Sequence, residues 1–182
     1  MAGTFTSPTL FLMSDKSPVT HDLTQLFEKI KEVRMAMLTT TDEHGSLHSR
    51  PMATINPGQD QALYFLTDGN SAKVFEVKKD SQVNLSYSDP GSNVYVSVSG
   101  QANAYRDQAK IDELWSEPMR GWFPKGKDDP NITILKVSID KGEYWDSPSS
   151  LLVQAYAYVR AVVTGEPSKD DDVNQHAQVR VK

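Results

Sequence analysis

Cysteine is absent from the 182 residues of this chain, which excludes disulfide bonds, thiolate catalysis and cysteine-ligated metal sites. No apolar run approaches the roughly 20 residues that a membrane-spanning helix needs. The first residues, MAGTFTSPTLFLM, carry no cationic segment, and their apolar stretch TLFLM is shorter than the core of a secretory signal. We therefore expect a soluble, cytoplasmic protein without a membrane partner.

An excess of positive charge is also lacking. Lys and Arg number 19 against 24 Asp and Glu, and the formal net charge is −5. An acidic chain without a basic patch is repelled by nucleic acid, so we predict no nucleic-acid partner. The 4 histidines show no metal-ligand spacing, and the glycine motifs of Rossmann and P-loop nucleotide sites do not occur. We predict no metal site.

Short strand patterns, separated by turn residues, make up most of the chain. They cover residues 33–41, 47–55, 62–67, 81–88, 94–105 and 132–139. After a turn at 140–142 the extended pattern resumes briefly, and Gly100 indicates a bulge or a close backbone approach. Turns join most of the strands, whereas parallel strands would need a crossover helix at every step. The pattern predicts an α+β, mainly β fold: a six-stranded antiparallel, barrel-like sheet with flanking helices.

Helical periodicity predicts the flanking helices and the domain limits. Residues 21–31, capped by Thr20 or Asp22, form the first helix, and Asp107 caps a third one that ends near Trp115. A last helix covers residues 149–165. We expect one domain over residues 21–165, a flexible arm over 1–20, and a polar tail over 166–182 that ends in a short strand or is flexible throughout.

A helix that begins at Ser71 is the first candidate site. Ser71 follows the turn Asp68-Gly69-Asn70 and precedes Val74, Phe75 and Val77, which the spacing places on one buried face. The first turn of a helix exposes unpaired N–H groups and the positive end of the helix dipole, so it attracts anions.

Two cations flank that helix start in the predicted fold. Lys73 lies in its first turn, and Arg50, on the second strand, offers a forked donor that suits phosphate oxygens. The pattern predicts a phosphate site. The alternative is that Ser71 only caps a surface helix, Lys73 is solvated and Arg50 makes a surface ion pair.

Five short motifs resemble one protein family. The motif R-P-M in the second strand, F-L-T in the third and S-A-K on the helix are followed by W-S-E-P-M-R-G-W-F-P-K-G and E-Y-W-D-S-P. In this order they resemble the pyridoxamine 5′-phosphate oxidase-like superfamily of FMN-binding split β-barrels. The last two motifs narrow the resemblance to the general stress protein 26 branch. It covers roughly residues 23–147.

The resemblance implies an FMN site at a homodimer interface, and it leaves FAD open. The implied phosphate ligands are Arg50, Ser71 and Lys73, and Thr67 would bond the phosphate or the ribityl chain. The residues implied at the ring or chain are Pro51, Met52, Phe65 and Leu66. Trp122, on the long loop at residues 116–130, would cover the ring from the partner subunit, with Tyr144 or Trp145 nearby. Trp115 and Trp145 fit the core equally well.

The resemblance implies an FMN-dependent oxidoreductase of unknown substrate. The alternatives are a protein that stores or senses flavin without turnover, a pyridoxamine 5′-phosphate oxidase, and a dimeric interaction module without a cofactor. Two departures argue against vitamin B6 oxidation. The Arg-x-His motif of those oxidases is replaced by residues 146–150, D-S-P-S-S, and Ala72 stands where their S-R-K motif has a cation.

Overall fold

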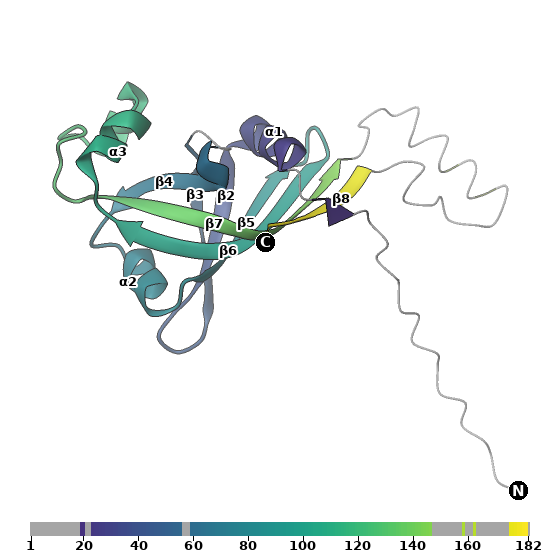
Figure 1. Cartoon of the computed structure of the whole chain (residues 1–182), viewed down its shortest axis with the longest axis horizontal. Helices are drawn as coiled ribbons and strands as arrows, with labels where there is room; N and C mark the ends of the chain where they lie inside the picture. The colour runs from purple at the N-terminus through teal and green to yellow at the C-terminus, as the bar shows by residue number, and fades with distance from the viewer. Residues whose placement is uncertain are drawn as a thin grey trace, which may run out of the picture.

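The structure, a computed structural model, describes residues 19–20, 23–55, 59–146, 158, 162 and 175–181. The strands are β1 (Val19–Thr20), β2 (Met35–Thr41), β3 (Leu47–Ala53), β4 (Ala62–Asp68), β5 (Gln82–Asp89), β6 (Val94–Tyr105), β7 (Ile132–Asp146) and β8 (Gln175–Arg180). The helices are α1 (Thr24–Val33), α2 (Ala72–Lys79) and α3 (Gln108–Leu114), with short 3-10 helices η1 (Gln59–Gln61) and η2 (Glu117–Gly121). The three α-helices lie apart from one another around the sheet (Figure 1).

The strands form one sheet in the order β1-β8-β7-β6-β5-β2-β3, and β4 pairs with β7 beside that path. All pairs are antiparallel except β1 with β8. The six predicted strands correspond to β2 through β7, so the α+β, mainly antiparallel fold is confirmed. The sheet is not closed, because a single isolated bridge, Ile55 to Tyr64, joins the end of β3 to β4 in the described chain. We call this opening between β3 and β4 the seam.

Strand β7 corrects one expectation. The sequence predicts a turn at residues 140–142, but β7 runs unbroken through them. The register between β6 and β7 shifts at Ser99 and Gly100, so Asp140 is the extra residue of a bulge. A Cβ on Gly100 would collide with the carbonyl oxygen of Ser138. The close approach predicted at Gly100 is therefore confirmed, and it lets one long strand absorb the turn-like residues.

The main core fills the inside of the curved sheet, and α1 covers it. Leu26 and Ile30 of α1 are fully buried against it, as are Leu38 of β2 and Val98 of β6. The first helix begins later than predicted, with Leu23 as its N-cap. The reason is that Val19–Thr20 is extended and paired with β8, so the helix cannot begin at the proposed cap Thr20.

Helix α2 begins as predicted but buries fewer residues. Ser71 is its N-cap, and Val74 and Val77 are buried. Phe75, predicted to share their face, is 58% exposed. Residues 74, 75 and 77 span too wide an arc for all three to face the sheet, because consecutive helical residues point about 100° apart.

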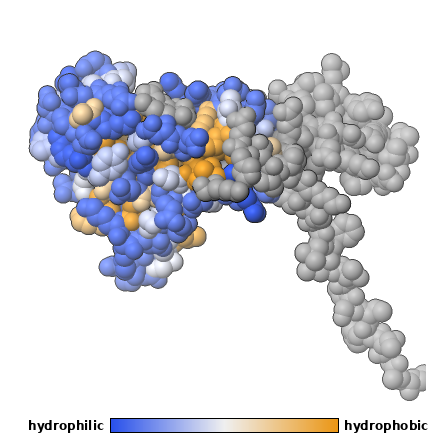
Figure 2. All heavy atoms as spheres, viewed as in Figure 1, coloured by the Kyte–Doolittle hydropathy of each residue, from blue (hydrophilic) through white to orange (hydrophobic). Residues whose placement is uncertain are grey.

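The chain ends are described only in part. The predicted arm lies outside the described residues except for β1, and the predicted last helix lies outside them except for Tyr158 and Val162. The short strand predicted in the tail is present as β8, whose Val179 is fully buried in the core. In the part of the chain that the structure describes, no helix is long and apolar enough to cross a membrane. Apolar surface gathers in the middle of the molecule, between hydrophilic regions (Figure 2).

Candidate functional site

A hollow of about 410 Å³ lies at the seam; we call it the seam hollow. Strand β3 contributes Arg50, Pro51, Met52 and Ala53; β4 contributes Leu66, Thr67 and Asp68; α2 contributes Lys73; and Met35, Ile55, Met119, Trp122 and Phe123 complete the lining. Beyond the bridge, where the Ile55 N–H donates to the Tyr64 carbonyl at 2.9 Å, the facing edges of β3 and β4 form no ladder within the described residues. Unpaired strand edges offer main-chain donors and acceptors to a ligand.

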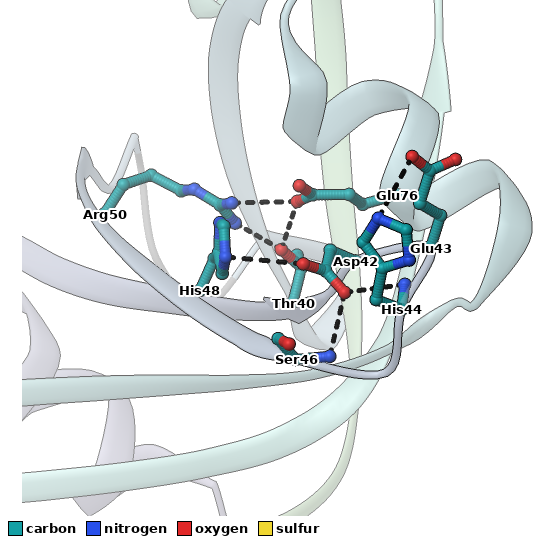
Figure 3. Close-up of polar contacts among 8 residues, drawn as sticks. All are labelled: Thr40, Asp42, Glu43, His44, Ser46, His48, Arg50 and Glu76. Atoms are coloured by element: carbon teal, nitrogen blue, oxygen red, sulfur yellow. Dashed lines mark hydrogen bonds and ion pairs between the residues drawn. The ribbon is translucent and has the colours of Figure 1, made fainter.

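Arg50 lies at the polar end of the seam hollow, and its guanidinium is fixed by two neighbours. One terminal nitrogen donates to the hydroxyl of Thr40 on β2, and the other donates to a carboxylate oxygen of Glu76 on α2 at 2.8 Å (Figure 3). Thr40 donates to that same oxygen at 2.5 Å. The Arg50 side chain is only 21% exposed and the Glu76 side chain 12%. The ion pair is thus partly buried, and the other N–H groups of Arg50 have no acceptor among the described residues.

Lys73 faces the same end of the hollow, and its charge is only partly compensated. Among the described residues it makes no hydrogen bond and no ion pair. Burial lowers the pKa of Lys73, and the nearby positive charge of Arg50 lowers it further, against smaller opposing effects of Asp68 and Glu76. Both causes disfavour the ammonium form. A bound anion would remove this penalty, so Lys73 fits an anion site better than a solvated surface.

The start of α2 provides the remaining polar groups. The Ser71 hydroxyl donates to the Asp68 carbonyl at 2.7 Å and lies 3.5 Å from the Thr67 hydroxyl. Ser71 is thus the N-cap residue by position, but its hydroxyl makes no capping hydrogen bond to the described residues of the helix. Within the described chain, the N–H groups of Ala72 and Lys73 have no acceptor. Helix starts with free N–H groups bind anions.

The rest of the lining is mainly apolar. Met52 and Leu66 line the hollow from the two strands, and Trp122 and Phe123 line it from the loop after η2. Trp122 is 74% exposed and lines the hollow of its own chain. The resemblance implies instead that Trp122 covers the flavin ring from the partner subunit. The Phe123 ring lies 6.3 Å from that of Trp115, which packs under α3.

Most of the residues singled out in the sequence come together here. The seam hollow includes Arg50, Pro51, Met52, Leu66, Thr67, Lys73 and Trp122. Ser71 lies beside Thr67, just behind the lining. Phe65 is fully buried in the main core and is not among the described lining residues, whereas Leu66, on the opposite face of β4, lines the hollow. Tyr144 is also in the core.

Sequence reasoning missed Glu76 and Thr40. Glu76 lies three residues after Lys73, one turn along α2, and this spacing places the two side chains on neighbouring positions of the helix surface. That was an available signal. No local pattern connects Thr40 with Arg50, because their contact arises from the pairing of β2 with β3.

The fold is that of a split-barrel protein, and its seam hollow joins a cationic end to an apolar wall. Residues 21–170 match the family described as pyridoxamine 5′-phosphate oxidase like, and the chain belongs to that family. The resemblance found in the sequence is confirmed.

Three known proteins illustrate the relationship. General stress protein 26 of Bacillus subtilis is 31% identical over 120 residues, which are 59% of this chain and 84% of that protein. Protein bli-3 of Neurospora crassa is 24% identical over 177 residues, or 91% of this chain and 84% of that protein. The crystal structure of the general stress FMN/FAD binding protein of Xanthomonas citri is 29% identical, with a TM-score of 0.60, and covers 70% of this chain and 89% of that one.

Proposed function

We propose that this protein binds FMN in the seam hollow and acts as a flavin-dependent oxidoreductase. The observation that carries the proposal is the convergence of Arg50, Lys73 and the free N–H groups of α2 at one end of the hollow. Such a set of donors suits a phosphate group. The Xanthomonas citri protein, which shares the fold, is described as FMN/FAD binding, and this supports a flavin as the ligand.

The chemistry of the lining fits the rest of a flavin nucleotide. Met52, Leu66, Trp122 and Phe123 offer an apolar wall for a planar ring. The hollow of about 410 Å³ is within the roughly 300–1,000 Å³ of small-molecule sites. Pro51 has no N–H, so at its position β3 offers only a main-chain acceptor to the seam. A ligand with both donor and acceptor atoms on its ring edge fits such a mixed strand edge.

The protein's own residues bind and orient the cofactor, and a bound flavin supplies one- and two-electron chemistry. Glu76 and Thr40 hold the Arg50 guanidinium beside the hollow, so that its free N–H groups stay in place for a phosphate. Lys73 adds a second charge in a partly dehydrated position, where electrostatic attraction is stronger than in water.

We also propose a homodimer with the cofactor at the interface. Support comes from apolar side chains on the outer face of β2 and β3, next to the hollow. Met35 is 50% exposed, Met37 43% and Leu47 73%, and Met37 pairs across the strands with Pro51, which lines the hollow. A second copy on this face would bury these side chains and cover one side of the site.

Flavin storage or sensing without turnover is the second candidate. It is favoured by the scarcity of acid-base groups among the described lining residues of the seam hollow, where the titratable ones are Arg50, Asp68 and Lys73. The experiment that separates the two is anaerobic reduction of the purified, flavin-loaded protein by NADH and NADPH, followed by its visible spectrum. Bleaching within seconds and reoxidation by an acceptor support the oxidoreductase. A flavin that stays oxidised supports storage or sensing, and a protein that binds no flavin contradicts both.

A further inference from the structure

A second hollow, of about 360 Å³, lies between the β2–β3 hairpin and α2; we call it the hairpin hollow. Its lining residues come from the hairpin turn and from one face of α2: Asp42, Glu43, His44, Ala72, Phe75, Glu76 and Lys79. Its volume is also within the range of small-molecule sites, roughly 300–1,000 Å³. No residue of this hollow except Ala72 belongs to the motifs that identify the family.

The two hollows adjoin at the start of α2. Arg50 lines the seam hollow and Glu76 lines the hairpin hollow. Their side chains form an ion pair of 2.8 Å (Figure 3), and this pair therefore belongs to the wall between the two hollows. The neighbouring residues Ala72 and Lys73 likewise line one hollow each. A ligand that reaches from one hollow to the other therefore passes the free N–H groups of the first helical turn, where phosphates bind favourably.

The lining of the hairpin hollow suits a nucleoside. Phe75 is 58% exposed, although it is a large apolar residue in a helix whose two valines are buried. An exposed aromatic ring in a hollow is a stacking platform for a base. The Glu43 side chain is 75% exposed at the turn, and a carboxylate is the usual acceptor for ribose hydroxyls.

The hairpin turn is held in a fixed shape. The carboxylate of Asp42 accepts the N–H groups of His44 and Ser46, each at 2.8 Å (Figure 3). These bonds, with that to Ser46 contributing most, lower the pKa of Asp42, so its carboxylate is ionised at neutral pH. Lys79 donates to the Glu43 carbonyl at 3.4 Å and links the turn to α2.

The charge of the lining decides which part of a nucleotide fits. Among its described lining residues, Asp42, Glu43 and Glu76 outnumber Lys79, so the hairpin hollow repels phosphate and accepts an uncharged group more readily. Phosphate groups are favoured on the other side of the wall, at Arg50 and Lys73. A dinucleotide fits both hollows when its diphosphate lies at the start of α2 and its uncharged nucleoside lies in the hairpin hollow.

We propose that the hairpin hollow binds the adenosine moiety of FAD. This inference rests on the proposed flavin function of the seam hollow, which would hold the flavin moiety of the same molecule. Phe75 is the stacking residue, Glu43 the ribose acceptor, and the first turn of α2 the diphosphate site. FAD then gains contacts that FMN cannot make.

The test uses the apoprotein of the wild type and of two variants. Each is titrated with FMN and with FAD, and binding is measured by flavin fluorescence. Wild-type protein binds FAD about tenfold more tightly than FMN, because a stacked base contributes on the order of a factor of ten. Phe75→Ala removes this advantage and leaves the FMN affinity unchanged. Lys78→Ala, on the same helix but lining neither hollow, changes neither affinity. Added adenosine weakens FAD binding and not FMN binding.

The outcomes separate the two proposals. Equal affinities for FAD and FMN in the wild type, or a Phe75→Ala variant that keeps the FAD preference, overturn the adenosine site and leave the flavin proposal standing. Adenosine that competes equally with both flavins also overturns it. A wild-type protein that binds neither flavin overturns the flavin proposal, and the adenosine site with it.

Discussion

Three side chains govern the polar end of the seam hollow. Arg50 and Glu76 form a partly buried ion pair, and Lys73 stands one turn before Glu76 without a partner of its own among the described residues. Replacing one partner of such a pair leaves the other charge poorly solvated. Asp68 acts on Lys73 only as a nearby charge, without a hydrogen bond or ion pair among the described residues. A positive charge that is only partly compensated therefore lies beside a helix start, and this is the electrostatic basis for phosphate binding here.

The lowered pKa of Lys73 leads to a pH prediction. Because its pKa in the folded, ligand-free protein lies below the ordinary 10.5, Lys73 loses its charge at a lower pH than a free lysine does. We expect the preference for FMN over riboflavin to fall as the pH rises through this lowered pKa, towards the preference of a Lys73→Ala variant. Affinities for both ligands between pH 7 and 10 check this.

The same shift has a consequence for stability. The charged form of Lys73 destabilises the ligand-free fold below its lowered pKa, and the penalty disappears once the unfolded lysine is also neutral. Lys73→Met should therefore raise the melting temperature of the apoprotein at pH 7, and the gain should vanish above about pH 10.5. A Lys73→Met variant that melts below the wild type at pH 7 would show that the charged form of Lys73 does not destabilise the fold.

For single residues of the site, the sequence predicts a position only where neighbouring residues carry the information. Ser71 and Lys73 could be placed because turn residues and helical spacing mark the start of α2. The Arg50 to Glu76 contact joins residues 26 positions apart, and it depends on how α2 packs at the end of the sheet. No short motif contains that information.

Among the secondary-structure elements, the β6 and β7 pair carries the longest ladder. The bulge at Gly100 lets β7 continue past Asp140, so that its first half pairs with β4 and its second half with β8. Alternation of apolar and polar residues was enough to predict these strands. It could not show that residues 140–142 stay in the strand, because β7 accommodates their turn-like composition with a bulge at Asp140, opposite Ser99 and Gly100 of β6.

Gly100→Ala tests that bulge. The new Cβ would meet the Ser138 carbonyl, a backbone atom that cannot move aside cheaply, so we expect a loss of about 2–3 kcal/mol in the free energy of unfolding. Gly121→Ala is the matched control, because nothing lies within 4 Å of a Cβ at that position. It should change stability by less than about 1 kcal/mol. Urea denaturation of both variants gives the comparison, and equal effects would refute the close approach.

For the molecule as a whole, the decisive feature is the seam. Five strand pairs connect β4, β7, β6, β5, β2 and β3 in a row, and between β3 and β4 the structure has only the bridge at Ile55 within its described residues. Strands β2 to β7 and their antiparallel directions could be predicted from turns and alternation, whereas β1, which lies in the predicted arm and pairs parallel with β8, was missed. Where the sheet stays open could not, because strand pairing between distant segments leaves no local pattern in the sequence.

The apolar outer face beside the seam yields a prediction about assembly. We expect a homodimer, and we expect Met37→Glu to convert it to a monomer, since an unpaired carboxylate in an apolar interface costs several kcal/mol. When the dimer is lost, flavin affinity should fall by about tenfold or more. Lys78→Glu is the control, because Lys78 lies on α2 rather than on β2 or β3 and lines neither hollow. It should leave the dimer and the flavin affinity intact. Sedimentation velocity with a parallel flavin titration checks this, and a wild-type monomer with full flavin affinity would refute it.

The most direct test of the account compares FMN and riboflavin binding in the wild type and in Lys73→Ala. Loss of one charge-assisted contact, worth about 1.5–3 kcal/mol, should weaken FMN by roughly tenfold or more while riboflavin, which lacks the phosphate, binds almost as before. Equal losses for the two ligands, or none for either, would contradict a phosphate site at the start of α2.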